Sequence, residues 1–282
     1  MMDEQGVQQF RAEVMARKNL PTIPTVLAKI LQLVDAESSS GKELIAVIER
    51  DQALTGKMLR LANSAFFGQT RRVATIPRAV VLLGFSTVRN LALGVKVWDA
   101  LGAGVARSRL EELWSHTVAV AVATKALAGR LRAGDPDEAF TAGLLHDVGR
   151  LVLAMRFRDE YWRAVGGASE AGEVEGLEAA NLGVDHAEVG GWILEAWSLP
   201  PTIVEAVRHH HETASRPGIP GVLGITDRLV AWTDLATGTL QPEAEALLAR
   251  LADRGITVAL WRDVVAKLAD DGELEALASL DT

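Results

Sequence analysis

Apolar residues recur along this chain three and four positions apart, and prolines and glycines interrupt the pattern at short intervals. Such spacing places apolar side chains on one face of a helix, as it does between Val26 and Val34. Alanine, leucine and valine dominate, and only 5% of residues are aromatic, which suits packed helices better than sheets. We therefore predict an all-α protein. The predicted helices cover 7–18, 25–34, 42–50, 52–64, 77–83, 86–93, 109–128, 136–145, 150–155, 186–197, 201–211, 225–235, 242–251 and 256–280.

Small residues and turn formers divide these helices into groups. Pro21 and Pro24 force an extended turn after the first helix. The small residues of 102–106 form a seam, so that we expect one helical half over 1–106 and a second over 107–235. Residues 236–282 form a helical extension that either caps the second half or mediates dimerisation. The stretch 166–176 is rich in glycine, serine and glutamate and is expected to be a mobile loop.

Charge and cysteine content exclude several classes of function. The net charge of −8 gives no general attraction to nucleic acid polymers or anionic membranes. Cysteine is absent, so any metal must be held by histidines and carboxylates. The charged N-terminus lacks the apolar core of a signal peptide, and no apolar run reaches the length of a membrane span. We therefore expect a cytoplasmic protein.

The histidines are confined to one part of the chain and lie on or beside predicted helices. The six are His116, His146, His186, His209, His210 and His211. Each alone could be a core or interface histidine that hydrogen-bonds across helices, and successive helical residues point about 100° apart, so at most two of the last three can face one pocket. Asp147, flanked by apolar residues, is costly to bury without a cation or several donors. Together they predict a metal pocket inside a helical bundle.

Several sequence segments, in this order, resemble the HDOD family, whose members are related to the HD and HD-GYP phosphohydrolases. In the first half they are LPTIP (20–24), DQALT (51–55), LRLANS (59–64) and AVVLLG (79–84). In the second they are AGLLHDVG (142–149), HAEVG (186–190), WSLP (197–200) and IVEAVRHHHE (203–212). The resemblance covers about residues 15–235. It implies an all-helical bundle with an N-terminal subdomain packed on an HD-like subdomain, acting in bacterial signal transduction.

The resemblance also implies a metal-binding set. Asp147 would bridge two metals as the aspartate of the HD pair, and Asp227 stands where the closing aspartate belongs. The implied ligands are His116, His146, Asp147, His186, His210, His211 and Asp227. Such a mixed set suits one or two divalent ions of iron, manganese, magnesium or zinc, and two ions a few ångströms apart suit phosphate ester hydrolysis.

Two features depart from the HD-GYP pattern. The Gly-Tyr-Pro signature is absent, since residues 213–218 read TASRPG, and Arg150 replaces the expected lysine. Arg150 keeps the charge but not the compact ammonium of lysine. Cyclic dinucleotide hydrolysis by analogy with the HD-GYP enzymes is thus weakened, whereas metal binding is not.

These features are compatible with three functions. The first is a non-catalytic HDOD module with a metal site, which binds a phosphate-bearing small ligand or nucleotide, or separate signalling proteins, and forms a homodimer if the extension dimerises. The second is a metal-dependent phosphohydrolase or phosphodiesterase, with Asp147 and Arg150 as candidate catalytic residues and Lys125 and Arg208 as further phosphate contacts. The third is a structural scaffold in which the histidines only form hydrogen bonds between helices.

Overall fold

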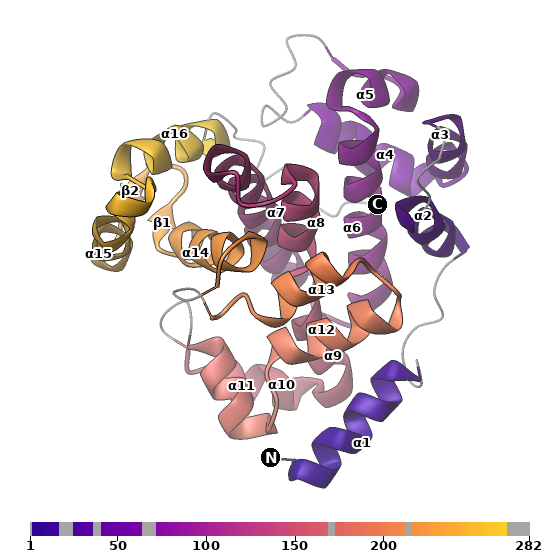
Figure 1. Ribbon diagram of the computed structural model, residues 1–282. Helices are drawn as coiled ribbons and strands as arrows, with labels where there is room; N and C mark the ends of the chain where they lie inside the picture. The colour runs from indigo at the N-terminus through magenta and orange to yellow at the C-terminus, as the bar shows by residue number, and fades with distance from the viewer. Residues whose placement is uncertain are drawn as a thin grey trace.

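The computed structural model describes residues 2–16, 25–35, 41–63, 72–168, 173–212 and 216–269. Within these residues the chain is helical almost throughout, which confirms the all-α prediction (Figure 1). The helices are α1 (Glu4–Met15), α2 (Thr25–Asp35), α3 (Gly41–Glu49), α4 (Gln52–Asn63), α5 (Ile76–Leu83), α6 (Phe85–Leu101), α7 (Arg107–Leu131), α8 (Pro136–Leu145), α9 (Val148–Phe157), α10 (Asp159–Val165), α11 (Val174–Leu182), α12 (His186–Ala196), α13 (Pro201–Arg208), α14 (Ile219–Ala231), α15 (Pro242–Leu251) and α16 (Val258–Ala269).

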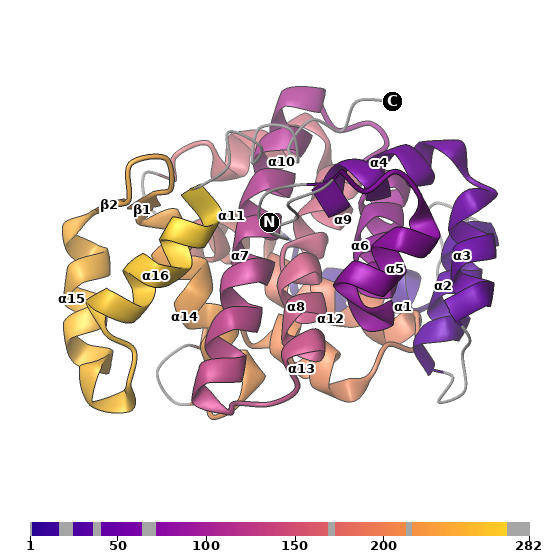
Figure 2. The ribbon, with the colours of Figure 1, turned by 90° about the horizontal axis from the view of Figure 1, so that it is seen from above.

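Helices α7 and α8 form the centre of the molecule, with α14 to α16 on one side and α2 to α6 on the other (Figure 2). They approach closely because small residues face each other. A Cβ atom added to Gly143 would lie 2.4 Å from the Cα atom of Ala121. This close contact fixes the end of α8, where the predicted site begins.

The N-terminal helices pack directly on the helix that leads to the site. Helix α6 contacts both α8 and α9. The Trp98 indole donates a hydrogen bond of 3.1 Å to the Leu144 carbonyl, and Gly94 lies against the Leu144 side chain. Helix α1 instead lies against α12, and its Phe10 contacts Trp192 of α12 and Phe157 of α9 edge to face. The buried apolar residues of all these helices form one continuous core.

The C-terminal extension packs against the second half. The two-residue strands β1 (Thr233–Asp234) and β2 (Thr239–Leu240) pair antiparallel, and helices α15 and α16 follow. Helix α16 contacts α7, and the Trp261 indole donates to the Thr233 hydroxyl at 3.1 Å.

Several predicted helix boundaries were wrong. The helix predicted over 225–235 spans Ile219–Ala231, because Pro220 occupies its first turn and Thr233 lies in β1. The helix predicted over 86–93 continues to Leu101, because α6 is buried on most sides and carries a weak polar face. Helix α13 ends at Arg208, so the three histidines follow it in a turn.

The expected loop over 166–176 was also partly wrong. Helix α10 ends at Val165 and helix α11 begins at Val174, so that only a short connection lies between two helices that the sequence did not predict. Residues 169–172 of this connection lie outside the described residues, as do the proline turn at 20–24 and the helix predicted beyond residue 269.

Among the described residues, no single helix has the length and apolar character needed to cross a membrane. Helices α5 and α6 have that length and apolar character only when they are taken together, and the chain bends by 120° between them.

Candidate metal centre

The structure brings all seven predicted ligands to one pocket between α7, α9, α12 and α14. His116 comes from α7, His186 from the first turn of α12 and Asp227 from α14. His146 and Asp147 form the junction between α8 and α9, and His210 and His211 lie in the turn after α13. The pocket therefore collects side chains from five separate segments.

The side chains of the pocket are within contact distance of one another. His146 Nε2 lies 3.5 Å from Oδ1 of both Asp147 and Asp227. His116 Nε2 lies 2.9 Å from Asp227 Oδ1, and His186 Nε2 lies 3.2 Å from Asp147 Oδ1. Two aspartates thus stand among the imidazoles.

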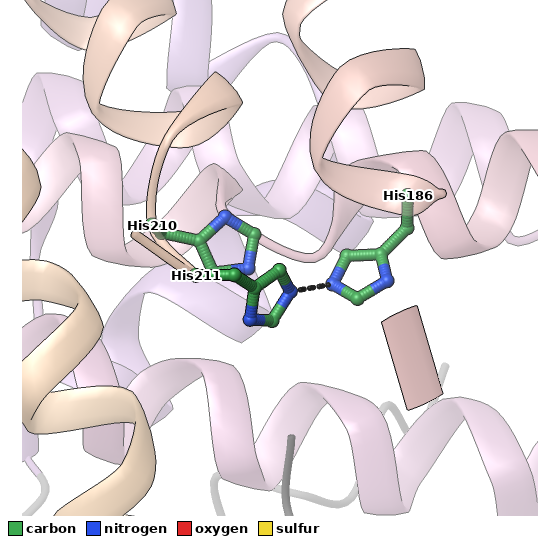
Figure 3. A group of neighbouring side chains, drawn as sticks. All are labelled: His186, His210 and His211. Atoms are coloured by element: carbon green, nitrogen blue, oxygen red, sulfur yellow. Dashed lines mark hydrogen bonds between the residues drawn. The ribbon is translucent and has the colours of Figure 1, made fainter. Parts of the chain in front are cut away.

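A second group of imidazoles faces the same space (Figure 3). His186, His210 and His211 each offer a nitrogen within 4.8 Å of the others. The Nε2 atoms of His186 and His211 are 2.9 Å apart. His116, His146 and Asp147 form a matching group with the same spacing limit. The two groups are joined by the contact of Asp147 with His186.

Hydrogen bonds on the outer side of the pocket orient two of the imidazoles. The Nδ1 atom of His146 donates to the Gly143 carbonyl at 2.8 Å, and that of His210 donates to the Val207 carbonyl at 2.6 Å. Since a carbonyl only accepts, Nδ1 carries a proton in both rings, and Nε2 is the ring nitrogen turned away from these carbonyls and toward the pocket. Sequence reasoning could not supply these bonds, because they depend on the turns at the helix ends.

The donor set fits a metal ion. The Nε2 atoms of His146 and His210 are buried and have no hydrogen-bond partner. A buried polar atom without a partner costs about 1–3 kcal/mol, and a cation between the two groups would remove that cost. Imidazole nitrogens with carboxylate oxygens suit iron, manganese or zinc.

The charges of the carboxylates are strongly stabilised. Burial raises the pKa of Asp147, but the charges of His146 and Arg150 outweigh it and hold this pKa well below 3.8. Burial likewise raises the pKa of Asp227, but the hydrogen bond with His116 and the nearby His146 ring hold it well below the same value. Both groups are therefore ionised at neutral pH, as metal ligands must be.

The imidazoles differ in their protonation. Burial, followed by nearby positive charge, lowers the pKa of His210 to about 3 and that of His211 well below 6.5. These two rings are neutral at pH 7 and keep a lone pair for a metal. Burial also lowers the pKa of His186, but the charge of Glu178 raises it well above 6.5. The carboxylates of Glu178 and Asp147 thus favour a positive charge on the His186 ring.

Gly149 permits the approach of the two helices that carry the site. A Cβ atom at Gly149 would lie 2.0 Å from the His186 carbonyl oxygen and 2.7 Å from the Gly190 nitrogen. The first turn of α12 can therefore lie directly on α9, which places Asp147 beside His186.

Two buried residues that the sequence did not single out complete a closed ring of hydrogen bonds and ion pairs. His186 Nδ1 donates to Glu178 Oε2 at 2.6 Å, and the Tyr161 hydroxyl donates to Glu178 Oε1 at 2.8 Å. Arg150 Nε donates to the Tyr161 hydroxyl at 3.2 Å, and Arg150 Nη1 donates to Asp147 Oδ2 at 3.2 Å. The contact of Asp147 with His186 closes the ring.

The other predicted polar residues lie outside the pocket. His209 pairs with Glu205 at 3.2 Å and with Glu212 at 2.8 Å. Lys125 pairs with Asp137 at 2.7 Å, and Arg208 pairs with Glu195 at 2.9 Å. Of the basic residues considered as phosphate contacts, Arg150 alone lines the pocket's cleft. That cleft has a volume of about 480 Å³ and is also lined by Arg109, Glu112, Trp162 and Glu175.

Glu178 is expected to act as a positioning residue for His186, one of the predicted metal ligands. In Glu178→Gln the amide keeps the shape but loses the charge that holds the ring, so we expect metal affinity to fall about 10- to 100-fold. Tyr161→Phe, which removes the other hydrogen bond to Glu178, should lower it by less than about threefold. Competition titrations with a chelator measure both. Equal affinities of Glu178→Gln and the unmodified protein would contradict this role.

Comparisons with known proteins support the family resemblance and the fold. The model of the HDOD domain family matches residues 20–213. An uncharacterised protein of Treponema pallidum is 27% identical over 205 residues, which are 71% of this chain but only 39% of that protein. This chain thus spans about two fifths of that relative.

Solved structures show the same fold along nearly the whole chain. A candidate phosphohydrolase of Shewanella amazonensis is 28% identical, with a TM-score of 0.70 over 94% of this chain and 96% of that one. An HDOD domain protein of unknown function from Geobacter sulfurreducens is 23% identical, with a TM-score of 0.75 over 99% of both chains.

Proposed function

Because the chain belongs to the HDOD domain family, we propose that it is a signalling protein in which a centre of one or two divalent metal ions binds a phosphate-bearing small molecule. The unpartnered Nε2 atoms of His146 and His210 carry this proposal. His146 lies against the ionised Asp147 and Asp227, and His210 lies beside His186 and His211. These four neighbours line a cleft large enough for a small organic ligand.

Arg150 gives the cleft its preference for phosphate. Its guanidinium is held by Asp147 on one side and by Tyr161 on the other, which uses two of its five N–H groups. The remaining N–H groups can donate to a phosphate oxygen, and the planar fork suits two such bonds at once. A bound metal would supply further positive charge for the phosphate.

Contacts between the two halves support an output through helix packing. The Trp98 indole on α6 bonds to the Leu144 carbonyl, two residues before His146. A ligand that shifts the end of α8 would therefore act on the N-terminal helices, which are free to serve as the surface for separate signalling proteins.

Hydrolysis of the bound phosphate ester is the second candidate function. It is favoured by the presence of two candidate ligand groups, which are joined by the contact between Asp147 and His186. Divalent ions in such a site activate water and stabilise charge on the leaving oxygen. The Asp147 and Asp227 carboxylates would hold the ions, while Arg150 would orient the phosphate. The Shewanella amazonensis relative, described as a candidate phosphohydrolase, supports this reading.

The test is phosphate binding with and without metal. Protein loaded with Mn²⁺ should bind inorganic phosphate in calorimetric titrations, and chelator-treated protein should not. Arg150→Ala should weaken binding about tenfold or more, since a charge-assisted contact contributes about 1.5–3 kcal/mol. Arg208→Ala, at an arginine held by Glu195 outside the cleft, is the matched control and should change nothing.

Binding that persists after chelation would contradict the proposal. Release of nitrophenol from bis(p-nitrophenyl) phosphate by the Mn²⁺-loaded protein, abolished in a variant that no longer holds metal, would establish the second function. Phosphate binding without any such release would leave the first alone.

A further inference from the structure

A second cavity adjoins the cleft of the candidate metal centre. It has a volume of about 960 Å³ and lies between the 103–106 connection, the end of α9 and α10. Arg109 and Trp162 line both this cavity and the cleft, so these two side chains lie between the two spaces. A ligand bound at Arg150 that extended past Trp162 would enter this cavity.

The second cavity is basic in an otherwise acidic chain. Arg109, Arg158 and Arg163 line it, against the single carboxylate of Asp159, whereas the whole chain carries a net charge of −8. Within the described residues none of these three arginines forms an ion pair. Arg109 instead lies over the Trp162 ring, with its Cζ atom 4.3 Å from the ring centroid.

The backbone is strained at Arg158, one of the residues that line the cavity. Its φ of 51° and ψ of −125° belong to a region that glycine favours and other residues rarely adopt. The Arg158 amide still donates to the Ala154 carbonyl at 2.8 Å and ends α9. Glycine would satisfy this turn with less strain, so the arginine is retained at a cost in stability.

We propose that this basic cavity binds a second anionic group of an organic phosphate whose first phosphate lies at Arg150, with a ring-containing spacer passing Arg109 and Trp162. The inference rests on the proposed function and names its ligand class: molecules with two anionic ends separated by a ring. Trp162 and the Arg109 guanidinium offer flat surfaces to that ring, and the other two arginines neutralise the far charge.

Adenosine 3′,5′-bisphosphate and adenosine 5′-monophosphate test this on the whole 282-residue chain loaded with Mn²⁺. In calorimetric titrations the bisphosphate should bind about tenfold or more tightly than the monophosphate. In the double variant Arg158→Gly/Arg163→Ala this advantage should fall below about threefold, with monophosphate affinity unchanged. Arg130→Ala is the matched control, because Arg130 is exposed on α7 about 30 Å along the helix from Arg109.

The melting temperature separates loss of binding from loss of folding. Arg158→Gly alone should melt at the same or a higher temperature than the unmodified protein while losing part of the bisphosphate advantage. If the monophosphate binds but the bisphosphate binds no tighter, or if the double variant keeps the full advantage, the second cavity is a solvated surface and the inference is wrong. If neither nucleotide nor inorganic phosphate binds, the proposed function fails with it.

Discussion

Asp147→Ala should remove the metal from the protein. We expect bound metal to fall below about a tenth of the content of the unmodified chain, and affinity to fall at least about 100-fold, beyond the usual effect of losing an outer hydrogen-bond partner. The reason is the position of the carboxylate. Asp147 Oδ1 contacts His186 Nε2 at 3.2 Å and lies 3.5 Å from His146 Nε2, so it is the carboxylate that joins the two groups.

Elemental analysis of untagged protein measures this outcome, because a histidine tag would bind metal itself. Asp137→Ala is the matched control, since Asp137 lies at the opposite end of α8 and pairs with Lys125. Circular dichroism should show that both variants are folded. Full metal content in Asp147→Ala would sink the bridging role, and the phosphate binding that depends on it would then need another explanation.

Gly149→Ala should produce the largest loss of stability. The added Cβ would lie 2.0 Å from the His186 carbonyl oxygen, which belongs to the backbone and cannot rotate away. Overpacking of a core costs about 1–3 kcal/mol and occasionally more. For a contact between two backbones we expect about 3 kcal/mol or more, or a fall in melting temperature of about 6 °C or more.

Gly56→Ala provides a control of opposite sign. Gly56 lies inside α4, and a Cβ there would meet nothing within 4 Å. Alanine should therefore raise the free energy of unfolding by about 0.5–1 kcal/mol, through its better helix propensity. Thermal melts of both variants measure the difference. Similar melting temperatures for the two would mean that α9 and α12 can separate without cost.

Sequence reasoning identified the pocket residues because each carries a side chain whose chemistry is visible in the chain itself. A buried aspartate next to a histidine, with further histidines in other helices, indicates a shared site whatever the helix boundaries are. The family resemblance then supplied the order of the pieces. The fold class followed from apolar periodicity, which the amphipathic helices such as α5 and α13 display clearly.

Apolar periodicity did not predict a helix correctly where its buried face is not apolar or where the helix has no exposed face. The buried residues of α11 are Glu178 and Leu182, so no apolar stripe marks this helix and its glutamate passes for a solvated charge. Helix α6 is buried on most sides, and its continuation to Leu101 has no amphipathic signature. The glutamate acquires its role only from the ring around His186, which no local pattern encodes.

The ring also makes the site observable from within the chain. Tyr161 is the one tyrosine in the sequence, and it bonds to the glutamate that holds His186. Biosynthetic replacement of tyrosine by fluorotyrosine would therefore label this position alone and yield a single fluorine resonance. Tyr161 also belongs to α10, the helix that carries Trp162 and Arg163. One nucleus thus lies in the ring beside the candidate metal centre and on the helix that lines the basic cavity, where it can report the occupation of either.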